Sequence, residues 1–573
     1  MRHGPHCPKP VLYVPKPVLY VDRLALRDGM VTMLSELKQV CFLSWAATIA
    51  ISGLAPWTCC SRVSLAGEAS TVALSPTELD RAFLENAKLN ESDLAATVSD
   101  EQFLRRVTLD LIGRQPTPDE LAVFLLDAST TKRESATERL LSSPEFGANW
   151  AAYWSDVIGY RVPPPELTFL DYTLFEQWLA GRINQNAPWD ETVRLILVAS
   201  GKVKDHPEAT FVGFHGADTT RLAAETARVF LSLQIGCAQC HDHPFDEWKR
   251  EQFHELAAYF VRASAKMPWN DSGEIEVKDK GKGEYEMPNV ADPSKKGTMM
   301  VPAFLTGEKL ETGKNDAERR SVLAQVVTNR ENPWFAKAFV NRVWGRLMGR
   351  GFYEPVDDMG AGNEPQLRDV HKSLTTSFVA SGFDTKALFR TIVNSKAYQQ
   401  SLNENPSLGT KPFAAARTTK LRGDEVFQSL VTAIELPNVT PPKTAPTKEI
   451  RFPPPPKSTK DLVSEAFGFD PSLRPEDISR TLGQAMLLMN NDQLQGQINA
   501  KPGSGTVLSK LLAAESDNAV AVTKLFQLVL ARRPSESEVK IALEHASSMS
   551  NRGEAFEDLL WSLINSAEFT TKR

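Results

Sequence analysis

Two cysteines and a histidine close together form the strongest chemical motif of this chain. Cys237, Cys240 and His241 have the C-x-x-C-H spacing at which a c-type haem is attached covalently. Thiols at this spacing can lie on one side of a helical turn and reach both vinyl groups of one porphyrin. The adjacent imidazole can then bind the iron as proximal ligand. The motif therefore predicts a covalent haem c that serves electron transfer.

Other chemistries can use the same residues. Two thiolates and two imidazoles make an acceptable tetrahedral set for zinc or iron, and His243 would complete that set with Cys237, Cys240 and His241. In an oxidising compartment the cysteines could instead form a disulfide that only holds a loop together. A redox-active dithiol is a third alternative, but the strand–helix–strand setting that it needs is not evident in the sequence.

The expected role of His243 differs between a haem and a zinc or iron ion. It follows His241 so closely that it cannot reach the opposite face of the same porphyrin. With haem, we expect His243 beside the ligand or a propionate, and the sixth ligand to be His215, His254, Met267 or water. With zinc or iron, His243 is a direct ligand.

Residues 1–70 are predicted to be a leader. A seven-residue segment is repeated at 8–14 and 15–21, which suggests that the true start is Met30 or Met33. An uncharged apolar run follows Lys38, and a cleavage site of small residues follows at 64–66. The pattern predicts export to the periplasm or cell surface, and the alternative is a retained membrane anchor. Four of the six cysteines lie in this leader, so its removal leaves only Cys237 and Cys240.

Composition limits the class of protein. A chain of 573 residues has room for two to four domains. Hydrophobic residues at 42% and charged residues at 24% are ordinary for a soluble globular protein. The formal net charge is -6, and no strongly basic patch stands out, so we expect no nucleic-acid partner.

The elements that position the motif are predicted to be helices. Apolar residues at helical spacing from Glu101 onward predict a helix that Gly113 ends. Thr117, Pro118 and Glu120 have the pattern of a capped start of the next helix.

Two further helices are predicted to flank the cysteines. A helix with Leu222 and Val229 on one face is expected to end at Gly236, where the motif begins. Asp246 is expected to cap the helix that carries Phe253 and Phe260.

The predicted fold is mainly α, a multi-helical protein of two domains. We expect a helical domain at 75–265, an irregular insertion at 266–317 and a second helical domain at 318–573. Glycines and alternating residues at 274–287 predict a small β-hairpin in the insertion. Residues 436–475 include a Pro-rich stretch and are expected to be a surface connector.

A faint internal repeat is visible. A capped helix start at 114–120 and a helix end at 140–146 resemble the segments 532–538 and 563–569, and 392–398 repeats the second half. Either a helical unit is repeated, or capped helices look alike by chance.

From about Leu79 to its end, the chain resembles large planctomycete proteins that pair a cytochrome-c-like domain of unknown function with a second, planctomycete-specific domain. The matching runs are 104–113, 116–118, 237–246, 331–336, 340–344, 349–352, 355–360 and 487–490. The resemblance implies a cytochrome-like first domain, and the biochemistry of the family is not established. The chain departs from the family after Pro365, where a Ser-His-Pro-Glu-type run is usual and His371 comes later.

A second group of polar residues lies in the C-terminal half. Asn341, Arg342, Trp344, Asp357 and Asp358 could line a sugar or anion site, with one aspartate as acid–base group or cation ligand. Alternatively, the arginine pairs with an aspartate and the indole packs in the core.

Three functions follow from these observations. The first is an exported haem c protein that transfers electrons to an unknown redox partner. The second is an enzyme or binding protein that uses a non-haem metal. The third is a cell-surface protein that binds carbohydrate or another partner and in which the cysteines are structural. No set of catalytic residues is indicated by the sequence.

Overall fold

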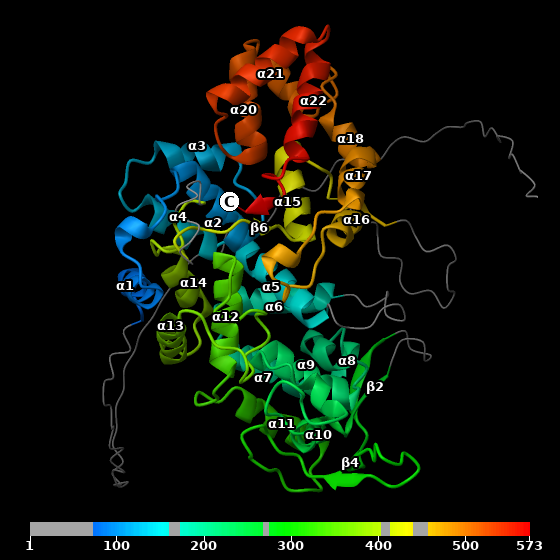
Figure 1. The fold of residues 1–573 in the computed structure, drawn as a ribbon. Coiled ribbons are helices and arrows are strands. Elements are labelled where there is room, and N and C mark those ends of the chain that lie inside the picture. The colour runs from blue at the N-terminus through cyan, green and yellow to red at the C-terminus, as the bar shows by residue number, and fades with distance from the viewer. Residues whose placement is uncertain (1–72, 160–171, 267–273, 403–412, 439–456, 573) are drawn as a thin grey trace, which may run out of the picture. The chain divides into compact units, whose positions relative to one another are not determined.

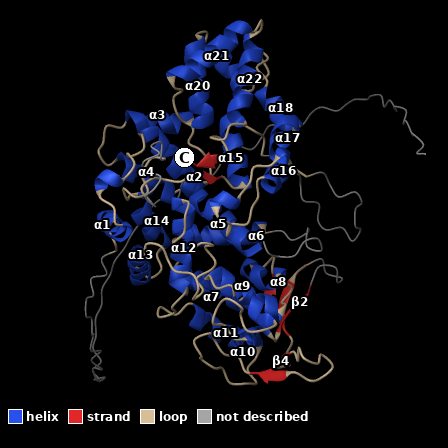
Figure 2. Ribbon diagram, in the orientation of Figure 1, coloured by secondary structure: helices blue, strands red, loops and turns tan. Residues whose placement is uncertain are grey.

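The structure is a computed structural model that describes residues 73–159, 172–266, 274–402, 413–438 and 457–572 (Figure 1). The described residues form 22 α-helices and three small antiparallel sheets (Figure 2). The mainly α fold predicted from the sequence is therefore confirmed. The predicted leader at 1–70 and Met267 lie outside the described residues. None of the described helices is both long and apolar enough to cross a membrane.

Nine helices precede the cysteines. They are α1 (Pro76–Ala87), α2 (Asp100–Ile112), α3 (Pro118–Leu126), α4 (Lys132–Leu141), α5 (Pro144–Gly159), α6 (Thr173–Asn184), α7 (Trp189–Val198), α8 (Thr210–Phe214) and α9 (Thr219–Leu231). Gly113 ends α2 with a φ of 72°, a conformation that favours glycine. Thr117 caps α3, because its hydroxyl accepts from the Glu120 amide and the Glu120 carboxylate accepts from the Thr117 amide. Both local predictions are confirmed.

The helix ends beside the motif differ from the prediction. The C-terminal end of α9 is Leu231, and Ser232 follows with a φ of 53°, so Gly236 does not end this helix. The next helix is α10 (Arg250–Ala257), and Asp246 does not cap it. Instead, Oδ1 of Asp242 accepts a hydrogen bond from the Arg250 amide at 3.0 Å.

Three of the short strands lie in the predicted insertion, and a fourth ends at its first residue, Lys266. β3 (Glu276–Asp279) pairs with β2 (Ala263–Lys266) and with β1 (Gly201–Lys202), whereas β4 (Tyr285–Met287) pairs with β5 (Thr298–Met300). The expected hairpin within 274–287 is therefore replaced by two separate pairings. Gly281 and Gly283 have positive φ values and lead the chain out of β3 before β4 begins.

Twelve helices follow the insertion. They are α11 (Asp316–Val327), α12 (Phe335–Met348), α13 (Arg368–Ala380), α14 (Thr385–Val393), α15 (Gly423–Ile434), α16 (Thr459–Ala466), α17 (Leu482–Asn490), α18 (Asp492–Ile498), α19 (Val507–Ala514), α20 (Asn518–Leu530), α21 (Glu536–Ser548) and α22 (Arg552–Ile564). Within the predicted connector, residues 439–456 are not described, and α16 follows them. β6 (Thr419–Lys420) pairs with β7 (Thr571–Lys572) at the end of the chain.

Hydrophobic side chains form two cores. The first includes residues from Leu79 to Tyr398, on both sides of the predicted insertion. The second extends from Leu421 to Phe569 and also includes Leu109 of α2. Because most other apolar residues of α2 belong to the first core, this helix contributes to both. The domain boundaries at 265 and 318 stay a prediction. A core that both parts share does not show whether either part folds by itself.

The first copy of the internal repeat is held by Arg114. Its Nη1 donates to Oε2 of Glu120 at 2.8 Å, and its Nε donates to Oε1 of Glu145 at 2.8 Å. The arginine thereby joins the start of α3 to the start of α5. Two-pronged contacts of this kind are the geometry that guanidinium and carboxylate groups prefer.

The second copy repeats the same contacts. Nη1 of Arg532 donates to Glu538 at 2.9 Å, and Nε donates to Glu568 at 2.7 Å. This arginine follows α20 and joins the start of α21 to the residues after α22. In the first copy, Arg114 follows α2 and joins the start of α3 to the start of α5 in the same way. Equivalent residues make equivalent contacts, which supports repetition of a helical unit over chance similarity.

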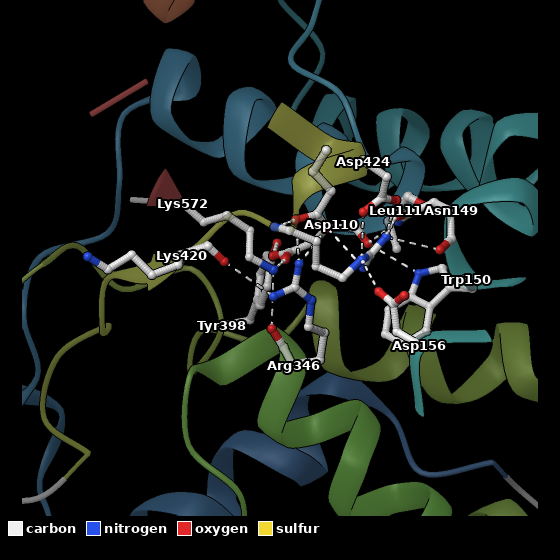
Figure 3. A network of polar contacts seen from close by, with 12 residues as sticks. Asp110, Leu111, Asn149, Trp150, Asp156, Arg346, Tyr398, Lys420, Asp424 and Lys572 are labelled. Carbon is white, nitrogen blue, oxygen red and sulfur yellow. Dashed lines mark hydrogen bonds and ion pairs between the residues drawn. The ribbon is translucent and has the colours of Figure 1, made fainter. Parts of the chain in front are cut away.

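A buried polar network joins α2 to the end of the chain (Figure 3). The Tyr398 hydroxyl donates to Oδ2 of Asp110 at 2.6 Å, and Lys572 forms an ion pair with Oδ1 of the same carboxylate. Beside them, Arg346 of α12 is paired with Glu425 of α15. These contacts hold β7 and α15 against α2 and α12.

Candidate functional site

The two thiols of the motif are exposed and free. Cys237 lies in a short 3-10 turn, Ile235–Gln239, and Cys240 follows this turn directly. Ile235 is 1% exposed and Ala238 is fully buried, so the turn is anchored by its apolar residues while both sulfur atoms stay accessible. Accessible, neighbouring thiols are what covalent modification of this segment requires.

His241 has one nitrogen engaged and one available. Its Nδ1 lies 2.7 Å from the carbonyl oxygen of Asp242, and a carbonyl can only accept, so Nδ1 carries the proton. In the neutral ring, Nε2 is then the nitrogen with a free lone pair. This is the tautomer in which histidine binds a metal through Nε2.

Asp242 holds the backbone directly after the motif. Its carboxylate accepts hydrogen bonds from the Arg250 amide and from Nζ of Lys249, both at 3.0 Å. The amide of Arg250, followed by the ammonium of Lys249, holds the pKa of Asp242 below its usual range. The carboxylate is therefore ionised and ties the motif to the start of α10.

The carbonyl of Gln239 ties the motif to the body of α10. It accepts from Nε2 of His254 at 2.9 Å and from Nε of Arg250 at 3.4 Å. Nδ1 of His254 in turn accepts from the hydroxyl of Tyr285 at 2.8 Å. Burial lowers the pKa of His254, in keeping with a neutral ring whose two nitrogens are both used.

His254 therefore positions the motif, and it is not free to serve as a sixth haem ligand. His215 is fully buried, and its Nδ1 donates to the carbonyl of Phe211 at 2.6 Å. Met267, the remaining candidate, lies outside the described residues. Nothing in the sequence indicated the roles of Gln239, Arg250 and Tyr285. These roles arise from backbone contacts and from a strand that is distant in the chain.

His243 lies in the turn that follows. Its Nδ1 accepts from the amide of Phe245 at 3.3 Å, and its own amide donates to the carbonyl of Trp248 at 2.8 Å. Among the described residues, no three or more His, Cys, Asp or Glu side chains are arranged to hold a metal ion. The predicted tetrahedral set is therefore not assembled in advance.

A second loop, residues 357–363, lies against the motif segment. Nε2 of Gln234 donates to Oδ1 of Asp357 at 2.9 Å. The amide of Ala361 donates to Oδ1 of Asp246 at 3.2 Å. The segment is therefore held on both sides of the cysteines by one distant loop.

Gly360 permits this close approach. A Cβ atom at this position would lie 2.2 Å from Oδ2 of Asp246, which is shorter than any normal contact. Next to Asp246, the ring of Phe245 is 87% exposed. An aromatic ring this exposed, five residues after Cys240 in the chain, is available to an apolar ligand or partner.

Comparison with protein families matches two regions of the chain, one that contains the motif segment and one that contains the loop at 357–363. Residues 78–265 match the family model PSCyt2, a protein of unknown function (DUF1549). Residues 319–466 match PSD1, a protein of unknown function (DUF1553). The chain therefore carries a PSCyt2 region followed by a PSD1 region. Comparison with curated proteins and with solved structures found no significant match.

The contacts between residues 234–246 and 357–363 are therefore contacts between the PSCyt2 and PSD1 regions. The name PSCyt2 indicates a cytochrome-like domain, and both regions are of unknown function. The resemblance predicted from the sequence runs is confirmed.

The polar residues predicted in the PSD1 region divide into different roles. Oδ1 of Asn341 accepts from the amides of Phe352 and Tyr353, at 2.7 and 3.1 Å. Trp344 is fully buried, with its ring centroid 4.8 Å from that of Phe352. These two residues shape the loop after α12, and the burial of Trp344 agrees with the structural alternative.

Asp357 is fully buried between two polar partners. Nη1 of Arg228 lies 3.7 Å from its Oδ2, and Gln234 occupies Oδ1. Asp358 accepts from the amide of Gly360 at 3.3 Å. Among the described residues, Arg228 is therefore the arginine within ion-pair distance of Asp357, and the charge of Asp357 also acts on the buried Arg342.

His371 follows the point at which the chain departs from the family pattern, and its side chain is buried in the core. Its Nε2 donates to the carbonyl of Lys337 at 3.0 Å, and its ring stacks on Phe352 with centroids 4.6 Å apart. Burial lowers the pKa of His371 to about 4.

Proposed function

We propose that the chain is an exported electron-transfer protein with a haem c attached covalently through Cys237 and Cys240 and ligated by His241. The observation that carries the proposal is the state of these three side chains. Both thiols are free and exposed, and the Nδ1–carbonyl hydrogen bond leaves Nε2 of His241 for a metal. A dithiol or a disulfide would need neither the histidine nor its tautomer.

The surrounding residues fit such a group. When bound, the haem supplies an iron centre that accepts and releases one electron. Asp242 and His254 hold the backbone on which the thiols and the imidazole are mounted. Phe245 offers an exposed apolar ring next to the motif, which suits the apolar porphyrin.

Neither His254 nor His215 is proposed as a sixth ligand, because one is engaged at both nitrogens and the other is fully buried. The export signal belongs to residues 1–70, which are not described. We expect N-terminal sequencing of protein from its native host to find a start near Ala66. An intact Met1 on protein retained in the cytoplasm would contradict export and weaken the haem proposal.

A haem-stained denaturing gel tests the attachment. We expect the full chain, made in a host with haem-attachment machinery, to retain haem after denaturation. The double variant Cys237→Ala/Cys240→Ala should lose it, while His241→Ala should alter the absorption spectrum. A colourless band from a competent host would refute the proposal.

His243→Ala separates haem from the other metals. Under haem, this variant keeps its cofactor and shifts its reduction potential slightly. Under the zinc or iron alternative, metal analysis of the variant should fall to background. A colourless, metal-free protein with oxidised cysteines would instead favour a structural disulfide in a cell-surface interaction protein.

A further inference from the structure

A basic pocket lies beside the C-terminal half of α12, away from the cysteines in sequence. It is enclosed by α12, by β6 and by the loop at 469–478. Its lining includes five basic residues and one acidic residue, namely Arg342, Arg346, Arg350, Lys420, Arg474 and Glu354. Arg342 and Arg346 are four residues apart and so share one face of α12, and Arg350 follows the end of the helix.

Several buried donors in this pocket lack a partner. Nε and Nη1 of Arg342, Nε of Arg350 and Oγ of Ser472 make no hydrogen bond within the described part of the chain. Arg342 is 1% exposed and Ser472 is 4% exposed. Buried polar groups are nearly always paired, so a group of unpaired donors around one cavity indicates an acceptor that comes from outside the chain.

The charges in the pocket are also unbalanced. Arg346 is neutralised by Glu425, and Nε of Arg350 lies 3.7 Å from Oε2 of Glu354. The other three cations, which are Arg342, Lys420 and Arg474, form no ion pair with a described carboxylate.

Arg342 is the deepest of these unpaired cations. Its Nη2 donates to the carbonyl of Arg228 at 2.9 Å, and a carbonyl carries no full charge. Burial lowers the pKa of Arg342, and it also lowers the pKa of Lys420, which is less deeply buried. Burial is the largest cause of both shifts, and for Arg342 the nearby Tyr153 and Asp357 favour the charged form without outweighing it.

We propose that this pocket binds a tetrahedral oxyanion, sulfate or phosphate, either free or as the end group of an ester. Such an ion has only acceptors and carries the charge that the pocket lacks, and guanidinium groups bind it with two parallel hydrogen bonds. The cavity has a volume of about 50 Å³, which leaves room for one such small group.

The pocket is connected to the motif segment through the backbone. Glu354, Pro355 and Val356 line the pocket, and Asp357, which follows directly, binds Gln234. Anion binding is nevertheless independent of haem, so the two proposals can fail separately.

Titration of the full-length protein with sodium sulfate and sodium phosphate, against sodium chloride at equal ionic strength, tests the pocket. We expect both oxyanions to raise the midpoint of thermal unfolding saturably and to give a binding isotherm by calorimetry. Arg474→Gln and Lys420→Gln at the rim should each weaken binding about tenfold, the cost of one charged hydrogen bond. Arg533→Gln and Lys501→Gln remove the same charges elsewhere and should leave the affinity unchanged.

Arg342→Met should abolish binding, but removal of this buried group could also unfold the protein, so the rim variants decide. Each variant is compared in chloride by circular dichroism to verify its fold. The proposal is overturned if sulfate and phosphate stabilise no more than chloride does, or if the rim variants bind as tightly as their controls. Phenyl phosphate and a sulfated monosaccharide distinguish the source, because tighter binding of an ester than of the inorganic ion identifies an end group.

Discussion

The carboxylate of Asp246 accepts a hydrogen bond from the amide of Ala361, although 115 positions separate the two residues in the chain. Gln234 makes a similar contact with Asp357 on the other side of the cysteines. The PSD1 region therefore forms part of the support on which the C-x-x-C-H segment of the PSCyt2 region rests.

The first prediction concerns that support. In Gly360→Ala, the new Cβ would meet Oδ2 of Asp246 at 2.2 Å, so we expect the contact to open. Hydrogen exchange of the amides at 235–248 should become faster. Gly236→Ala is the matched control, because nothing lies within 4 Å of its Cβ, and it should exchange like the wild type. Unchanged exchange in Gly360→Ala would show that the PSD1 loop does not hold the motif.

The second prediction concerns pH. Burial lowers the pKa of His371 to about 4 from an ordinary value of 6.5, so the unfolded chain takes up this proton first as the pH falls. The free energy of unfolding should therefore decrease between pH 6.5 and 4, by up to about 3 kcal/mol from this residue.

Urea unfolding of wild type and His371→Phe across this range checks the contribution of His371. The variant keeps an aromatic ring against Phe352 and should show a shallower slope. Some slope remains, because burial also lowers the pKa values of His215 and His254. Equal slopes in the two proteins would contradict the assignment to His371.

The third prediction concerns the buried ion pair at the end of the chain. Lys572→Met leaves the carboxylate of Asp110, whose side chain is 1% exposed, without its closest cation. We expect a loss of about 3 kcal/mol in the free energy of unfolding, as for a buried charge that loses its partner. Asp110→Asn/Lys572→Met should recover part of this loss, and the exposed Lys501→Met should cost little. A double variant less stable than Lys572→Met would argue against the pair.

The fourth prediction concerns the internal repeat. Arg114→Ala and Arg532→Ala each remove charged hydrogen bonds to two glutamates, and each should cost about 2 kcal/mol. Since these contacts hold the pKa values of Glu120 and Glu538 at about 2, they stabilise the fold above pH 4.5 and lose this effect as the pH falls toward 2. The variants should thus approach the wild type in acid. A large cost in one copy and none in the other would count against equivalent roles.

What the sequence by itself determined about this protein was mostly local. The end of α2 at Gly113 and the capping box of Thr117 and Glu120 were predictable, because the interacting groups lie within a few residues of one another. The same holds for the mainly α fold, the repeated capped segments and the family, which rest on residue spacing and on contiguous runs. The C-x-x-C-H motif was recognised in the same way, and its haem stays a prediction.

Only the tertiary structure decided how the motif is held. The end of α9 before Gly236, the separate partners of β3 and β4, and the use of His254 by Gln239 involve contacts that no sequence window contains. The basic pocket likewise joins α12 to β6 and to a loop more than a hundred residues away. Local signals specify where helices begin and end. Contacts between distant side chains depend on how all the helices pack around their shared cores, because a hydrogen bond forms only where packing brings donor and acceptor within about 3 Å.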